Sequence, residues 1–365
     1  MSDIRFTRFD NRFKESLIDF LGMGMSWAEI TKKERKELFE WKYEKNPYVE
    51  KPLCYLAFDG ETIVGHRGFV LQKFFTGEED YLIGTPGDSM VHPDHRRKGI
   101  FSKLVDFSTE DIVNRSMIDI FTSLSTTRAT TKATERYGYV PVGERKKLYR
   151  FSMKKLFQAK YKSGIDLNTR ISGEERGFTI ETTNELKIDD IVELMKTSTN
   201  DKKLRNLRNR EFYRWRFEEY PKDLIYLYIW DQNDLKAYLS IEKDNILFRG
   251  FDLEYYSLLE YGYGDIKLFK ELIQTLTKNL HLPSMMSYVF TRKKEEIEIL
   301  RKHRFKGSES YLIKSLQKKG ILDEEGLPGL LVKPASKTVD HSDFYLDNID
   351  TRKEKNWSLF WSDVH

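Results

Sequence analysis

The pattern of apolar and polar positions predicts a chain that mixes helices and strands from the start. Residues 4–9 form a short apolar strand pattern, and residues 13–21 repeat apolar side chains at helical spacing. A second helix is predicted over residues 32–44, where aromatic residues cover a broad face and Asn46-Pro47 provides a stop. Further helices and strands alternate along the rest of the chain, which predicts an α/β (α+β) protein.

A hairpin is predicted next, because the alternating runs 53–58 and 62–73 are separated by Asp59-Gly60. Another strand begins at residues 81–83 and is interrupted by Gly84-Thr85-Pro86-Gly87 before residues 88–91. Proline cannot donate to a ladder and glycine weakens a strand, so this interruption predicts a bulge. A plain loop between two short strands is the alternative reading.

The stretch from Asp88 to Val105 combines a strand, a tight turn and a helix that begins near Gly99. The helix starts with basic rather than acidic residues, although a helix N-terminus favours anions. Basic side chains at a positive helix end are suited to holding a multiply charged anion, which a glycine backbone can approach closely. A solvated basic turn before an ordinary surface helix is the alternative.

The string Val91-x-Pro93-x-x-Arg96-Arg97-Lys98-Gly99-Ile100 resembles the acetyl-CoA-binding motif of the GNAT N-acetyltransferase superfamily. The resemblance implies a splayed sheet that takes the pantetheine arm of acetyl-CoA, the cosubstrate, and a turn that wraps its pyrophosphate. Phe101 departs from the small residue that the family prefers. The implied cofactor-binding residues are Met90, Val91, Arg96, Arg97, Lys98, Gly99, Ile100, Phe101 and Ser102, with the Met90 or Val91 N–H as oxyanion donor.

Catalytic candidates are fewer and rest on position alone. Asp88 lies close to where the family often keeps a general base, and a turn or bulge cap is its structural alternative. His66, on the neighbouring predicted strand, is a second candidate base, though a lone strand histidine is more often structural. Tyr137 is the tyrosine nearest to the position of the family's general acid. No metal ligand set is predicted.

After the basic turn, the pattern predicts a strand at 117–125, a helix at 126–137 closed by Gly138, and a final strand of this sheet at 147–153. The second part of the chain repeats this order of elements. Trp41 and Pro47 align with Trp215 and Pro221 in a similar aromatic helix. We therefore predict two tandem GNAT folds, each with a mixed, splayed central sheet flanked by helices.

The second copy lacks the basic turn. It has Glu260-Tyr-Gly-Tyr-Gly-Asp265 in that place, where Asp265 is a natural helix N-cap. A carboxylate there would occupy the helix end that a phosphate needs, so we expect one cofactor site. Residues 308–318 are predicted as the last strand of this copy. The predicted divisions are an N-terminal acetyl-CoA-binding domain at 1–156, a linker at 157–177, a C-terminal domain at 178–320, and a tail at 321–365 docked on a domain.

Composition limits the function classes. The 62 basic and 58 acidic residues nearly balance at a net charge of +4, so nucleic-acid binding is not predicted. The single cysteine excludes an internal disulfide framework. No leader pattern or apolar run long enough for a membrane span is visible, which predicts a cytoplasmic protein.

The leading hypothesis is an N-acetyltransferase that moves an acetyl group to a primary amine of a small molecule, possibly an amino sugar, in a ternary complex. An aminoacyl- or longer-acyl transferase is the first alternative. A CoA-sensing module without turnover is the second. The oligomeric state is not predicted.

Overall fold

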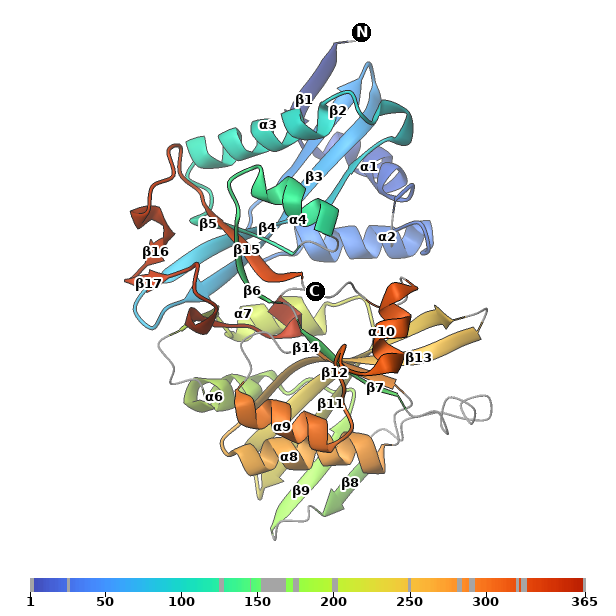
Figure 1. Cartoon of the computed structure of the whole chain (residues 1–365), viewed down its shortest axis with the longest axis vertical. Helices are drawn as coiled ribbons and strands as arrows, with labels where there is room; N and C mark the ends of the chain where they lie inside the picture. The colour runs from blue at the N-terminus through green and yellow to red at the C-terminus, as the bar shows by residue number, and fades with distance from the viewer. Residues whose placement is uncertain are drawn as a thin grey trace.

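The computed structural model describes residues 3–24, 27–124, 128–144, 146–151, 169–172, 177–198, 203–248, 251–280, 284–288, 293–319, 322 and 327–363. Two mixed sheets with flanking helices lie one above the other along the long axis (Figure 1). The predicted α/β class with large mixed sheets is therefore confirmed. No helix in the described part of the chain is long and apolar enough to span a membrane.

The first sheet has the strand order β1-β2-β3-β4-β5-β15-β6, with β10 and β18 at its edge. Its strands are β1 (Ile4–Arg8), β2 (Cys54–Asp59), β3 (Thr62–Phe75), β4 (Asp80–Val91), β5 (Ile120–Ser123), β6 (Val140–Glu144), β10 (Leu204–Asn206), β15 (Pro328–Pro334) and β18 (Trp357–Ser358). Its helices are α1 (Lys14–Leu21), α2 (Lys32–Phe39) with a π-helical extension η3 (Glu40–Glu44), α3 (Ile100–Asn114) and α4 (Arg128–Glu135).

The second sheet has the order β7-β14-β13-β12-β11-β9-β8. Its strands are β7 (Lys147–Phe151), β8 (Thr169–Ser172), β9 (Phe178–Thr183), β11 (Leu224–Asp231), β12 (Asp234–Phe248), β13 (Phe251–Tyr263) and β14 (Ser284–Tyr288). Its helices are α6 (Ile188–Ser198), α7 (Arg210–Tyr213) with π-helical η6 (Arg214–Glu218), α8 (Ile266–Gln274) with π-helical η7 (Thr275–Asn279), α9 (Lys294–Lys302) and α10 (Tyr311–Lys318).

The predicted hairpin of β2 and β3 is confirmed, with Asp59 paired to Thr62 and Gly60 at a φ of 58°. The interruption predicted at residues 84–87 is wrong, because β4 runs without a break from residue 80 to 91. The bulge lies slightly later. His66 pairs with Met90 and Gly68 with Gly87, so Asp88 and Ser89 together oppose the single residue Arg67.

The pairing between β4 and β5 covers only the start of the strands. These parallel strands pair at Ile83–Ile120 and Gly84–Phe121, and a hydroxyl contact of 2.6 Å links Thr85 to Thr122 just beyond that point. No described residue of β5 pairs with β4 from residue 86 to residue 91. The first sheet is therefore splayed there, as the resemblance implied.

The two sheets exchange strands. β7, predicted to close the first sheet, instead pairs with β14 of the second. β15, from the C-terminal tail, lies between β5 and β6 of the first sheet. Alternation of side chains indicates a strand but does not name its partner, so this exchange could not be read from the pattern.

Two other segments differ from their predictions. Residues 311–318, predicted as strand, form helix α10. Residues 169–172, placed in the linker, form β8, which pairs with β9 at the edge of the second sheet. The other predicted linker residues lie almost wholly outside the described residues.

A reciprocal contact joins the helices η3 and η6. The Trp41 indole donates to the Trp215 carbonyl at 2.7 Å, and the Trp215 indole donates to the Trp41 carbonyl at 2.8 Å, across 174 residues. The two rings stack at 5.8 Å. Each helix has a five-residue π segment around its tryptophan. The two tryptophans thus hold equivalent positions in this contact, while the tandem repeat itself stays a prediction.

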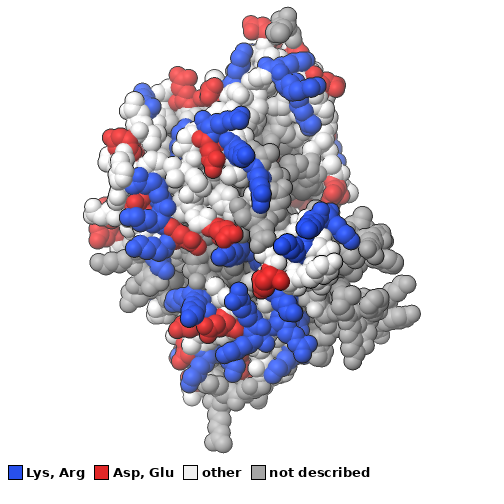
Figure 2. Space-filling view, in the orientation of Figure 1, with Lys and Arg blue, Asp and Glu red and all other residues white. Residues whose placement is uncertain are grey.

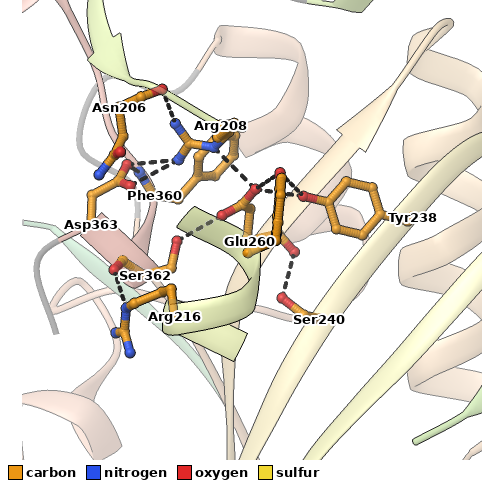
Figure 3. A network of polar contacts seen from close by, with 10 residues as sticks. Asn206, Arg208, Arg216, Tyr238, Ser240, Glu260, Phe360, Ser362 and Asp363 are labelled. Carbon is orange, nitrogen blue, oxygen red and sulfur yellow. Dashed lines mark hydrogen bonds and ion pairs between the residues drawn. The ribbon is translucent and has the colours of Figure 1, made fainter. Parts of the chain in front are cut away.

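The C-terminal tail packs against both sheets. Trp357 is only 1% exposed and contacts Phe74 of β3. Figure 3 shows the end of the tail at the second sheet, where Arg208 lies between Glu260 of β13 and Asp363 of the tail. Its guanidinium contacts Glu260 at 3.0 Å and Asp363 at 2.9 Å, and all three side chains are buried. The tail is thus fixed to β13 by a buried ion-pair network.

Candidate functional site

The basic turn leads directly from β4 into α3. Arg97 and Gly99 both have positive φ, 63° and 75°, which turns the chain sharply before Ile100. Gly99 is the N-cap residue and has no side chain to cap the helix. The intrahelical ladder begins with the Lys103 N–H donating to the Gly99 carbonyl, so the preceding N–H groups of the first turn remain for an anion. Residues 96–99 are exposed.

Three hydrogen bonds fix this turn to the sheet. The His92 N–H donates to the Val64 carbonyl at 2.9 Å, and His95 Nε2 contacts Asp59 Oδ2 at 3.0 Å. Arg96 Nε donates to the Val91 carbonyl at 3.3 Å. The second sheet differs at the same place, because Asp265 caps α8 by accepting from the Lys267 N–H at 2.8 Å. The predicted N-cap is confirmed, and it fills the helix end with a carboxylate.

The backbone N–H groups near the end of β4 point alternately to β3 and to the splayed edge. Backbone groups of successive strand residues point to opposite sides, and the His92 N–H points to β3. The Val91 N–H therefore points to the other side, the splayed edge, while the Met90 N–H points to β3. This alternation selects Val91 over Met90 as the donor that can reach a ligand in the splay.

Asp88 is held by three donors in the bulge, at a φ of 51°. Its Oδ1 accepts from the Trp27 indole at 3.0 Å, and its Oδ2 accepts from Lys42 Nζ at 2.8 Å and the Tyr43 hydroxyl at 2.6 Å. Burial acts to raise the pKa of Asp88, but the Lys42 charge and these hydrogen bonds outweigh it and lower the pKa to about 2. Such a carboxylate is a poor proton acceptor at neutral pH.

Replacing Asp88 by asparagine should remove a pH-dependent part of the stability. A carboxyl whose pKa falls from 3.8 to about 2 on folding stabilises the fold above pH 3.8, and this contribution is lost as pH falls through 2. Its size is about 2 kcal/mol. Urea unfolding of wild type and D88N between pH 2 and pH 6 checks this: the difference between them should shrink toward low pH. A constant difference would contradict the Lys42–Asp88 pairing.

His66 lies beside Asp88 on β3 and is fully buried. Its Nδ1 contacts the Asp88 carbonyl at 2.8 Å, which requires a proton on Nδ1 and leaves Nε2 as an acceptor. Burial lowers the pKa of His66 to about 4, so the ring is neutral at pH 7. Nε2 has no hydrogen-bond partner among the described residues.

Tyr137 lies apart from this pair. Its hydroxyl donates to Ser102 Oγ at 3.0 Å, and its ring lies 6.5 Å from that of Phe101. The structure thus brings Asp88 and His66 together next to Tyr43, and places Tyr137 with the cofactor-binding candidates of α3. Phe101, the residue that departs from the family pattern, is 37% exposed and contacts Tyr137 rather than filling the turn.

Trp27, Lys42 and Tyr43 surround the candidate site, but the sequence did not single them out. Of these three residues, Lys42 has the most unusual position in the sequence. It is a charged residue between two aromatic residues, Trp41 and Tyr43, which are both buried. A lysine that is only 22% exposed needs a partner, and Asp88 supplies it. The spacing of these residues indicated only an aromatic helix face.

A pocket of about 520 Å³ lies along α3, between Val105 and Asn114 on one side and Tyr137, Lys333 and Lys337 on the other. It does not include Asp88 or His66. Figure 2 shows Lys and Arg side chains over α4, and Arg128, Lys132 and Arg136 are exposed at intervals of four residues. Basic side chains therefore accompany both the start of α3 and one face of α4.

Comparison with known proteins gives a match to one family model and several structures with a similar fold. Residues 24–142 match the family model described as acetyltransferase (GNAT) domain. No curated protein matches the sequence. Among solved structures, a probable N-acyltransferase of Enterococcus faecalis superposes with a TM-score of 0.62 at 11% identity, covering 92% of this chain and 73% of that one.

Two further structures share the fold. A GCN5-related N-acetyltransferase of Anabaena variabilis has a TM-score of 0.55 at 10% identity, with 92% of this chain and 73% of that one covered. N-myristoyltransferase of Saccharomyces cerevisiae, solved with myristoyl-CoA, has a TM-score of 0.59 at 15% identity, with 99% and 90% covered. Residues 24–142 are thus similar to a GNAT acetyltransferase domain, and the whole chain shares its fold with these three structures.

Proposed function

We propose that the protein transfers an acyl group from acyl-CoA to a primary amine of a small molecule, in a ternary complex. The observation that carries this proposal is the edge of β4 at residues 86–91, which no described residue of β5 pairs and which leads to the N-terminus of α3, where no side chain caps the helix. One edge thus offers a ladder position for an extended chain, the Val91 N–H, and a basic anion site at Arg96–Gly99.

The residues of the splay have separable roles in this proposal. Acyl-CoA, when bound, supplies the thioester that the amine attacks. The N–H groups at the start of α3, with Arg96, Arg97 and Lys98, hold its pyrophosphate. The Val91 N–H donates to the thioester oxygen, which gains negative charge during attack. Asp88 positions Lys42, Tyr43 and His66 rather than taking a proton, since its carboxylate is already held by three donors.

We assign the amine to the His66 side of the sheet, where Nε2 is buried and would accept one amine N–H, directing the nitrogen lone pair, once the amine displaces the atoms that cover it. A neutral imidazole without a partner suits this role, whereas its low pKa makes it a weak base. The acid limb of the pH–rate profile should then follow the pKa of the acceptor amine.

Replacing His66 by glutamine should lower kcat roughly 100-fold without changing the affinity for acyl-CoA. Steady-state kinetics of wild type and H66Q with two amines of different pKa measure both the loss of kcat and the position of the acid limb. The acid limb should move with the amine in wild type. An acid limb that stays fixed for both amines would assign the titration to a protein group and contradict the proposal.

Acetyl and longer acyl chains are the two candidates for the group that is transferred. The family match names acetyltransferases, whereas the yeast N-myristoyltransferase that shares the fold was solved with a C14 acyl-CoA. We propose acetyl as the group transferred, because the match covers the part of the chain that carries β4 and α3. A series of acyl-CoA lengths from acetyl to myristoyl, ranked by kcat/KM, decides between them.

Release of free thiol from acyl-CoA in the presence of a panel of small amines, including amino sugars, tests the proposed function. Amine-dependent release supports it. Binding of acyl-CoA without release, seen as thermal stabilisation alone, would instead assign the protein as a CoA sensor. Failure to bind would contradict both.

A further inference from the structure

Arg67 is a buried cation at the bulge of the first sheet. The residue is 6% exposed, and its Nε has no hydrogen-bond partner among the described residues. Its contact with Ser89 Oγ is long, at 3.5 Å, and the Tyr139 hydroxyl is its other polar partner. Burial lowers the pKa of Arg67, and no carboxylate of the described residues forms an ion pair with it. A buried charge of this kind costs free energy unless a partner is supplied.

The position of Arg67 follows from the alternation of β3. His66 and Gly68 face η3, since the His66 ring lies 6.3 Å from that of Tyr43 and Gly68 lies directly under the Tyr43 hydroxyl. Arg67 and Phe69 therefore face the opposite side. There the Arg67 guanidinium lies over Phe69, which packs with Leu104 of α3, Phe121 of β5 and Tyr139 after α4. At the bulge, Arg67 thus lies on the face of the sheet that α3 covers, and His66 lies on the opposite face, which η3 covers.

The bulge beside Arg67 is next to the splayed edge of β4. Ser89, which Arg67 contacts, belongs to the segment of β4 that no described residue of β5 pairs, two residues before Val91. The exposed turn that suits phosphates begins later, at Arg96. A ligand that runs along this edge from the turn toward the bulge would bring its far end, and not its phosphates, to Arg67.

We propose that Arg67 stabilises the negative charge on the sulfur that leaves when the acyl group is transferred. The inference rests on the proposed function. In that reaction the amine nitrogen forms a bond to the thioester carbon, the C–S bond breaks with its electron pair on sulfur, and the amine loses one proton to solvent. The positive charge of the Arg67 guanidinium stabilises the negative charge of the thiolate as it forms, and the thiolate is in turn the anion that Arg67 otherwise lacks. The amine arrives on the side of His66, and the sulfur departs on the side of Arg67.

The direct test is the ionisation of free CoA bound to the protein, followed by the ultraviolet absorbance of its thiolate. A cation within about 4–6 Å lowers the pKa of an acidic group by roughly 1–3 units. The bound thiol should therefore titrate at lower pH in wild type than in R67M, with R67K in between. Equal titration in wild type and R67M would overturn the inference.

Binding of desulfo-CoA, which lacks the sulfur, separates this role from phosphate binding. R67M should bind desulfo-CoA as tightly as wild type, whereas R96M, in the phosphate turn, should bind it more weakly. Weaker binding of desulfo-CoA to R67M and R67K would make Arg67 a phosphate contact or a structural residue, and would overturn the inference.

Kinetics give the third readout. In R67M, kcat should fall roughly 10²–10³-fold, the usual cost of removing one donor to a developing anion, with KM for acyl-CoA almost unchanged. Added methylguanidinium should restore part of the rate in R67A. A wild-type protein that binds CoA but releases no thiol would refute the proposed function, whereas full activity in R67M and R67K would refute only the role of Arg67.

Discussion

Replacing Gly99 by tryptophan should abolish the stabilisation of the fold by CoA. Ligand at about 100 times its dissociation constant should raise the unfolding free energy of wild type by roughly 2.7 kcal/mol. In G99W the indole would fill the space in front of the first turn of α3, which contains no other described atom within 4 Å of the added Cβ. Denaturant unfolding with and without CoA measures both values, and thiol release should fall with them.

Gly77→Trp is the matched control. Gly77 also has a positive φ, 108°, and open space around an added Cβ, but it lies in the turn between β3 and β4, away from α3. Both variants carry the backbone strain of a side chain at positive φ, about 1–2 kcal/mol. Only G99W should lose the effect of CoA. Equal stabilisation of both variants by CoA would show that the anion site is not at Gly99.

Replacing Arg208 by methionine should destabilise the protein by about 3–5 kcal/mol at pH 7, because it leaves Glu260 and Asp363 as buried carboxylates without their cation. Arg214→Met is the control. Arg214 is 63% exposed and, among the described residues, forms an ion pair with Glu218 of its own helix, so its loss should cost less than about 1 kcal/mol. Urea unfolding of the two variants beside wild type measures both effects.

The loss in R208M should depend on pH. Burial, together with Glu260, raises the pKa of Asp363 even though Arg208 lowers it. Removing Arg208 removes the opposing effect, so the folded variant takes up a proton more readily than the unfolded chain. A group whose pKa rises on folding favours the fold at pH below that pKa. The deficit of R208M should therefore shrink from pH 7 toward pH 5. Parallel curves of unfolding free energy against pH for wild type and R208M would show that the two carboxylates do not control the deficit.

The parts of the site that follow from local sequence were predictable. The basic turn and the helix start at Gly99 depend on residues within a few positions of each other, and so does the Asp265 cap of α8. The partners of Asp88 were not predictable in this way. Trp27, Lys42 and Tyr43 reach it from 45 to 61 residues away in the chain, and nothing in their spacing names the contact.

The same distinction applies to the fold. The hairpin at Gly60 and the aromatic helices around Trp41 and Trp215 were visible because turn chemistry and helical periodicity are local. The exchange of β7 and β15 between the sheets was not visible. β15 follows β5 by about 200 residues, and the side-chain alternation of β7 and β15 fits either sheet equally well. Residues 311–318 show the converse case, since a short apolar run fits a strand or a helix.

The place of β15 also constrains the order of events during synthesis. Among the described residues, β5 and β6 do not pair with each other and are joined through β15, whose last residue is Pro334. The sheet that contains the proposed acyl-CoA edge therefore cannot close while residues 328–334 are still inside the ribosome. The facing edges of β5 and β6 stay open until residues 328–334 have emerged, about 200 residues after β5, and such edges are where aggregation begins. Protection of these edges by a chaperone is consequently most needed until residues 328–334 have left the ribosome.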